Sequence, residues 1–196
     1  MIIDITQEIL SCRIYPGDPH PQARKLQDMA KGDLYNLSEF SMCAHNGTHL
    51  DAPAHFIKDG GTIDTIGLDA CVGRCFVARH TGPVTARDAH AIMAKAARLG
   101  ADSRILIAGD AVVTQESAEV FAAYKLKLIG NESQSVGPEN APMAVHRILL
   151  GTGCLLLEGV VLTDVKEGRY FLSAAPLNIK GAEGAPCRAY LIGEDL

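Results

Sequence analysis

Short apolar runs and stretches with helical spacing alternate along the first two thirds of the chain. Between Thr85 and Gly100, apolar residues recur on one face of a helix, with Thr85 placed to cap its start and Gly100 to stop it. Four runs are apolar at most positions, which is typical of strands; they read MIIDI, CFVARH, RILIAG and LKLIG. We therefore expect strands and helices in alternation.

Two further helices and a strand-rich C-terminal part complete the pattern. Thr114 is placed to cap a helix that reaches about Tyr124. A third helix is expected over residues 141–150, because Pro142 is tolerated in a first turn and Gly151 can end the helix. The last third has short apolar segments separated by Gly and Pro, and we expect it to be mostly β; they read CLLLEGVVLTDV, RYFLSAAPLNI and CRAYLIG. The whole pattern predicts an α/β fold with a mixed β core.

Length and charge narrow the class of protein. A chain of 196 residues that is 47% hydrophobic can form one core, so we expect a single domain over residues 1–196. The net charge is -5, and no block of like charges suits DNA, RNA or an anionic membrane, so a small molecule is the expected partner. The N-terminal stretch lacks a basic region, and no apolar run reaches the roughly 20 residues that span a bilayer. We expect a cytoplasmic protein.

Six cysteines are scattered through the chain without C-x-x-C spacing. A chain of this size does not need disulfides, so we expect them to be reduced thiols. Cys43 stays open as a soft metal ligand, because it lies two residues before His45.

The stretch HNGTHLDAPAH, residues 45–55, holds three histidines and an aspartate. Gly47 and Pro53 disfavour a helix, and a straight strand of this length would be about 33 Å long, too long for its ends to share one site. An extended chain that bends at Gly47 and near Pro53 would bring the polar side chains together.

Imidazoles and a carboxylate form a ligand set that suits Zn²⁺, Mn²⁺ or Fe²⁺, with one position left for water. A solvated polar loop is the alternative, although turn chemistry does not require histidine. Further along the chain, Glu158 lies in an apolar run, where a carboxylate is costly to bury without a cation or strong donors. His146 falls on the third expected helix. Either residue alone is explained as a core or surface side chain; with the first cluster, both are candidate ligands.

The eleven residues match the pattern H-x-G-T-H-x-D-x-P-x-H and resemble the cyclase family of metal-dependent hydrolases, which includes bacterial kynurenine formamidases and isatin hydrolases. Matching segments run nearly end to end; they read YPGD, GNESQSVGPENAP, VHRILL, LLLEGVVLTDVKEGRYFLSAAPLNI and APCRAYLI. The resemblance implies a swivelling β/β/α domain that is a homodimer or a higher homo-oligomer.

The resemblance also implies a role for each residue of the site. His45, His49 and Asp51 match ligands of a first metal. Asp51 would bridge to a second metal that also takes His146, and Glu158 would contact both ions. His55 matches the catalytic acid and base. Two divalent ions are implied, Zn²⁺ first and Mn²⁺ as the alternative.

The implied activity is hydrolysis of a small amide of the formamide type by a water that the metal activates, with His55 moving its proton. The serine-hydrolase pattern G-x-S-x-G is absent. Three alternatives stay open: a lactone or cyclic-imide hydrolase, a cyclase or lyase, and a catalytically silent metal-binding protein. Tyr15 precedes PGD where kynurenine formamidase has tryptophan, so it is a candidate substrate contact, or it only packs the turn before Pro16.

Overall fold

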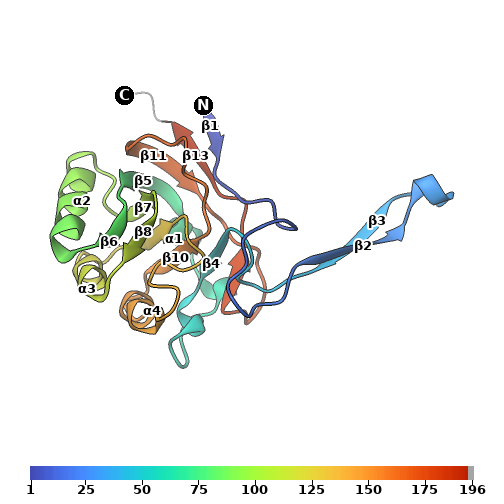
Figure 1. Cartoon of the computed structure of the whole chain (residues 1–196), viewed down its shortest axis with the longest axis horizontal. Coiled ribbons are helices and arrows are strands. Elements are labelled where there is room, and N and C mark those ends of the chain that lie inside the picture. Colours follow the sequence, from blue (N-terminus) through green and yellow to red (C-terminus); the bar gives the residue numbers. More distant parts are fainter. Residues whose placement is uncertain (194–196) are drawn as a thin grey trace.

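A single nine-stranded sheet organises the molecule, whose computed structural model describes residues 1–193 (Figure 1). Its centre consists of parallel strands, which are in sheet order β5 (Val72–Arg79), β7 (Arg104–Ala108), β9 (Leu128–Asn131) and β10 (Leu155–Glu158). Antiparallel strands flank them, with β11 (Gly168–Ser173), β13 (Tyr190–Gly193) and β1 (Ile2–Asp4) beyond β5, and β4 (His49–Asp51) and β12 (Gly184–Pro186) beyond β10. The expected α/β fold with a mixed sheet is confirmed.

Three helices connect the parallel strands and cover one face of the sheet: α2 (Ala86–Arg98), α3 (Gln115–Ala123) and α4 (Met143–Leu150) (Figure 1). The caps predicted at Thr85 and Thr114 are confirmed, since each hydroxyl accepts from the backbone N–H three residues on. Helix α4 begins at Met143, two residues later than expected. Its entry residue Pro142 stands before the helix and uses its carbonyl oxygen to accept from the backbone N–H of His146.

Three small elements lie along the chain between the larger ones. Strands β6 (Gly82–Val84) and β8 (Ala111–Val113) form a short parallel pair ahead of α2 and α3, and a single helical turn, α1 (Leu68–Cys71), leads into β5.

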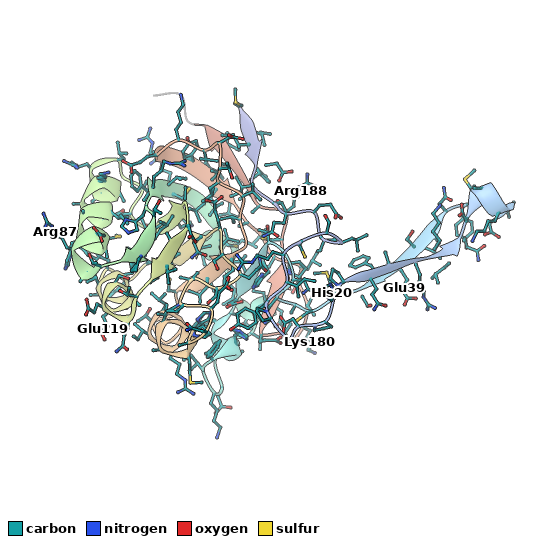
Figure 2. All side chains as sticks on the ribbon, in the orientation of Figure 1. His20, Glu39, Arg87, Glu119, Lys180 and Arg188 are labelled. Atoms are coloured by element: carbon teal, nitrogen blue, oxygen red, sulfur yellow. The ribbon has the colours of Figure 1, made fainter. Side chains whose placement is uncertain are left out.

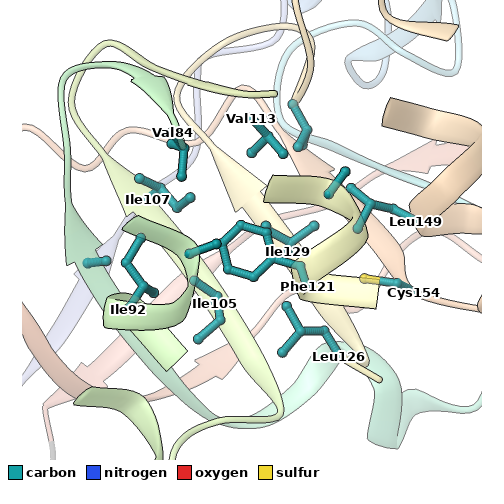
Figure 3. Close-up of a cluster of buried hydrophobic side chains, with 14 of the residues drawn as sticks. Val84, Ile92, Ile105, Ile107, Val113, Phe121, Leu126, Ile129, Leu149 and Cys154 are labelled. Carbon is teal, nitrogen blue, oxygen red and sulfur yellow. The ribbon is translucent and has the colours of Figure 1, made fainter. Parts of the chain in front are cut away.

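Both faces of the central sheet are buried, as the apolar runs of these strands predict. On the helix side, Ile105 and Ile107 of β7 pack with Phe121 of α3 and Leu149 of α4 (Figure 3). On the other side, alternate residues of the same strands join a second cluster that also takes Leu50 of β4, Leu172 of β11 and Leu191 of β13. Strands from opposite ends of the sheet therefore share one core, which requires the sheet to curl around it.

A long hairpin leaves this body as an arm (Figure 1). It consists of β2 (Gln22–Gln27), β3 (Leu37–Ser41) and a short 3₁₀ turn at Met29–Lys31. Nearly every residue of both strands is exposed, and Figure 2 shows side chains projecting from the arm into solvent. The sequence analysis did not predict this arm, because its apolar residues do not alternate regularly with polar ones and so indicate no buried strand face.

The C-terminal part, which was expected to be mostly β, contains strands that are shorter than the apolar runs suggested. The run that contains Glu158 was expected to continue as β-structure, but β10 ends at this residue. Gly159 follows with a φ of 66°, and a Cβ at this position would lie 2.4 Å from the carbonyl oxygen of Gly47. The close approach of the two loops turns the chain out of the sheet. No helix within residues 1–193 is both long and apolar enough to cross a membrane.

Candidate metal centre

The bends expected in residues 45–55 are present. Gly47 adopts a φ of 65°, β4 carries His49 and Asp51, and a 3₁₀ turn at Pro53–His55 follows. In the antiparallel ladder between β4 and β10, His49 lies directly opposite Glu158. The sheet therefore joins the first cluster to a carboxylate that is more than a hundred residues away in the chain.

Helix α4 brings His146 to the same place from the face of the sheet that it covers. Its Nε2 atom lies 3.2 Å from Glu158 Oε1 and 3.6 Å from Asp51 Oδ2. His49 approaches from the strand, with Nε2 at 3.5 Å from Glu158 Oε2 and 3.4 Å from Asp51 Oδ1. All four side chains are buried.

Asp51 occupies the middle of this arrangement, and its side chain is fully buried. Its Oδ1 atom lies 2.8 Å from Nδ1 of His45 and faces His49, while its Oδ2 atom faces His146. Glu158 divides its two oxygens between His49 and His146 in the same way. Two groups of candidate ligands result, His45 with His49 and Asp51, and Asp51 with His146 and Glu158; in each, the ligand atoms lie within 4.8 Å of one another.

Backbone carbonyls orient two of the three histidines. His49 Nδ1 donates to the carbonyl oxygen of Gly47 at 3.0 Å, and His146 Nδ1 donates to that of Pro142 at 2.9 Å. Because a carbonyl oxygen only accepts, both rings keep an unprotonated Nε2 available toward the carboxylates when they are neutral. This is the tautomer that a metal ligand needs.

Charges in the cluster shift one another's pKa values. Burial by itself would raise the pKa of Asp51, but the adjacent imidazoles of His45 and His49 hold it well below its usual range. Burial and the Asp51 charge act in the same way on Glu158, whose pKa is nevertheless lowered by His146 and His49. Burial would lower the pKa of the three imidazoles, but the adjacent carboxylates raise it in His45, His49 and His146. The carboxylates are thus ionised and strongly attract cations.

Unsatisfied atoms at this centre favour a bound cation. His49 Nε2 and Asp51 Oδ2 are buried and have no hydrogen-bond partner among the described residues. Such atoms are rare in folded proteins because each one costs free energy to desolvate. Nitrogen and carboxylate donors of this kind, in two groups that share Asp51, fit two borderline divalent ions.

His55 lies at the edge of the cluster. Its Nε2 atom is 3.9 Å from Asp51 Oδ2, its ring stacks on His45 with centroids 4.1 Å apart, and its side chain is 28% exposed. Burial is the main influence that lowers the pKa of His55, so its imidazole is neutral at pH 7. A neutral, accessible imidazole beside the candidate ligands can accept a proton.

Tyr15 lines a cavity of about 490 Å³ formed by the N-terminal loop. Its hydroxyl donates to the carbonyl oxygen of Glu139 at 2.5 Å, and the Glu139 carboxylate in turn accepts from Arg13 and Ser133. Cys12 lines the same cavity and packs against Gly47, whose added Cβ would lie 3.3 Å from that of Cys12. The cavity therefore adjoins the loop that carries the first ligands.

Cys43 is not brought into the cluster. Neither of the two candidate ligand groups within the described residues includes it, and its Sγ atom lies 3.8 Å from Asp18 Oδ2. Two polar contacts of the centre escaped the sequence analysis. The backbone N–H of Val136 donates to Glu158 Oε1 at 2.7 Å, and Glu183 lies beside His45. A backbone N–H donor cannot be identified from residue type. Glu183 could not be identified either, because it reaches the site only through the pairing of β12 with β4.

The chain is similar to known proteins. Residues 3–138 match the family model described as "Putative cyclase". A kynurenine formamidase of Erythrobacter litoralis (strain HTCC2594) is 32% identical over 204 residues, which cover 97% of this chain and 93% of that enzyme.

Solved structures of similar fold extend over the whole chain. One is described as a potential metal-dependent hydrolase with cyclase activity; it has a TM-score of 0.80 and 26% identity, and the match covers 100% of this chain and 99% of the other. Isatin hydrolase A of Labrenzia aggregata has a TM-score of 0.82 over 97% of this chain and 93% of its own. At 20% identity, the second likeness shows the fold alone.

Proposed function

Since the chain belongs to the Cyclase family, we propose that it is a metal-dependent hydrolase that cleaves a small amide of the formamide type. The observation that carries this proposal is the bridging position of two buried carboxylates. Asp51 and Glu158 each direct one oxygen toward His49 and the other toward His146. Two divalent cations held by these residues would supply chemistry that suits hydrolysis of a carbonyl compound.

We assign His45, His49 and Asp51 to a first ion, and Asp51, His146 and Glu158 to a second, with Glu158 also reaching the first. Three imidazoles and two carboxylates favour Zn²⁺, and Mn²⁺ is the alternative. When bound, such an ion supplies Lewis acidity and lowers the pKa of a water that it coordinates.

His55 is assigned the proton transfers. Its Nε2 atom lies 3.9 Å from Asp51 Oδ2, and its lowered pKa leaves this nitrogen free to accept the proton of the attacking water. The imidazolium then donates that proton to the departing nitrogen. Stacking on His45 and an edge contact with Phe56, whose ring centroid is 4.5 Å away, hold the ring in place for both steps.

The cavity that adjoins the Gly47 loop through Cys12 is assigned to the substrate, with Tyr15 as one wall. Because the phenol oxygen is bound to the carbonyl of Glu139, the ring is held in place and presents an apolar surface. The second candidate function is hydrolysis of a lactone or cyclic imide. The fold that this chain shares with isatin hydrolase A supports this candidate.

A panel of substrates tests the function directly. Protein stripped with a chelator is reloaded with Zn²⁺ or Mn²⁺ and assayed on aryl and alkyl formamides, cyclic imides and lactones. We expect turnover of at least one formamide that depends on the added metal. Binding of metal without turnover of any compound in the panel would support the catalytically silent alternative, and preference for the cyclic compounds would support the second candidate.

We propose that the arm joins two copies of the chain. A two-stranded hairpin is marginally stable alone, yet this one exposes a set of large apolar side chains: Leu26, Met29, Leu34, Tyr35, Leu37 and Phe40. Its charges balance, with Arg24, Lys25 and Lys31 against Asp28, Asp33 and Glu39. A surface with charges of both signs and several exposed apolar side chains suits self-association about a two-fold axis.

Sedimentation velocity tests this interface. We expect wild type to sediment as a dimer or a larger oligomer, and Leu34→Ser with Phe40→Ser to shift it to the monomer. Tyr124→Ser, which changes a comparably exposed ring at the end of α3, is the matched control and should leave the assembly intact. A monomeric wild type would contradict the proposal.

We also propose that the chain acts as one domain in the cytoplasm. The single curled sheet to which both halves of the chain contribute supports the first point. The six cysteines are free, which suits a compartment that keeps thiols reduced.

A further inference from the structure

Glu183 places a carboxylate against the outer side of His45. The ring of His45 turns Nδ1 toward Asp51, at 2.8 Å, and Nε2 toward Glu183 Oε1, at 3.3 Å. The Nε2 atom is buried and has no aligned hydrogen bond among the described residues, so Glu183 is the group available to it. The Glu183 side chain is 47% exposed and can rotate to improve that alignment.

The other two candidate histidine ligands show what an outer partner does. In His49 and His146 the nitrogen that faces away from the carboxylates donates to a main-chain oxygen. His45 is reversed, because its Nδ1 faces inward and its Nε2 outward. Its outer partner is a charged side chain, so a substitution can remove it, which is not possible for the two carbonyls.

The backbone around Glu183 is shaped to hold this contact. Its carbonyl oxygen accepts from the N–H of Ala52 at 2.8 Å, and Gly184 pairs with Asp51 in the ladder between β12 and β4. A Cβ on Gly184 would lie 2.7 Å from Cε1 of His45, so a side chain at this position would collide with the ring. Residues 183 and 184 thus contact both the body and the outer nitrogen of one ring.

We propose that Glu183 is a positioning residue that holds His45 with Nδ1 toward the first metal ion. The proposal rests on the metal centre proposed above. A carboxylate that accepts from Nε2–H fixes the tautomer in which Nδ1 is free to bind, and it raises the basicity of the ring. Loss of such a partner typically weakens metal binding by about 10- to 100-fold.

Metal affinity measured by competition with a chromophoric chelator tests the proposal on the full chain. We expect Glu183→Ala to weaken one of the two equivalents by about 10- to 100-fold and to leave the other within about twofold of wild type. The metal affinity of Glu183→Gln should lie between those of wild type and Glu183→Ala, because its amide oxygen still accepts from Nε2–H but carries no charge. Glu119→Gln, at an exposed position of α3 and on the side of the body away from the arm in Figure 2, should match wild type.

A second readout uses Co²⁺, whose visible absorption reports the geometry of its ligands. The spectrum should change in Glu183→Ala, recover in part in Glu183→Gln, and stay constant in Glu119→Gln. Equal affinities and spectra in all four proteins would overturn the role of Glu183 while the metal centre stands. Loss of one full equivalent at saturating metal in both Glu183 variants would make Glu183 a ligand and overturn positioning. Absence of tight metal in wild type would overturn the centre itself, and this proposal with it.

Discussion

The metal cluster and the hairpin arm reverse the usual distribution of side chains in opposite ways: the cluster buries charged side chains, and the arm exposes apolar ones. In the cluster, ionisable side chains from β4, β10 and α4 are buried and lie 3.2 to 3.6 Å from one another. In the arm, the strands satisfy their backbone hydrogen bonds with each other, and apolar side chains such as Leu34, which is 93% exposed, remain in solvent.

The two regions differ in how much they depend on the packing of the body. Charged groups can stay buried only when partners surround them, so the cluster needs the rigid sheet on which it is built. The side chains of the arm are not packed against the body, so its sequence can be adapted to bind a second copy of the chain. We therefore expect substitutions in the two regions to affect different measurements.

The largest expected effect is on the shared carboxylate. Asp51→Ala should remove ligands from both proposed ions and lower kcat/KM by on the order of 10³-fold or more, since several kcal/mol of electrostatic stabilisation are lost. Elemental analysis should show metal falling well below wild type, and His49→Ala should behave alike. Metal content equal to wild type in both variants would contradict the assignment of the site.

His55→Ala separates proton transfer from metal binding at the same cluster. Most of the metal should remain, and kcat should fall by about 10²- to 10⁴-fold, the usual contribution of a general acid and base. Metal content and kcat are measured on the same preparation. A parallel loss of both would instead make His55 a ligand.

Core and arm can be compared by unfolding with denaturant. Ile107→Ala leaves a cavity between the sheet and its helices and should lower the free energy of unfolding by about 2 to 5 kcal/mol. Phe40→Ala, at an arm residue that is 61% exposed, should change it by less than about 0.5 kcal/mol at concentrations where the protein is monomeric. A large loss for Phe40→Ala in the monomer would show that the arm packs on the body.

Metal affinity should rise with pH. Although burial acts against it, the adjacent carboxylates raise the pKa of His45 and His146, and they raise the pKa of His49 to about 10. In the metal-free protein these rings therefore hold a proton to higher pH than a free imidazole does, and a binding ion must displace it. For each proton displaced, the metal affinity should rise about tenfold with each unit of pH, up to the raised pKa. Calorimetry in buffers of different ionisation enthalpy counts the released protons; Glu39→Gln in the arm should release the same number, and a count of zero would contradict the shifts.

Tyr15→Trp should have the smallest effect. An indole offers a larger apolar face than a phenol and gains roughly 0.5 to 1.5 kcal/mol against an aryl substrate, which is about tenfold or less in kcat/KM. We expect wild type to favour a smaller or less aromatic compound than N-formylkynurenine, and the variant to shift toward that substrate at constant metal content. Turnover of N-formylkynurenine by wild type near 10⁵ M⁻¹s⁻¹, within the ordinary enzyme range, would contradict this.

Local patterns were sufficient for much of the fold. The helix caps at Thr85 and Thr114 and the strands of the central sheet follow from residues within a few positions of one another. The bend at Gly47 also follows from the residues beside it. The arm could not be predicted in this way, because its strands lack the alternation that burial of one face imposes on a sequence.

The sequence by itself determined the α/β class, the family resemblance and which polar residues could meet a metal. Only the tertiary structure decided how they meet. The β4–β10 ladder sets His49 opposite Glu158, β12 brings Glu183 to His45, and α4 delivers His146. These contacts join residues far apart in the chain, and their register depends on which strands pair. Spacing along a sequence reports neighbours within a turn or a strand, whereas strand pairing across the curled sheet is a property of the whole core.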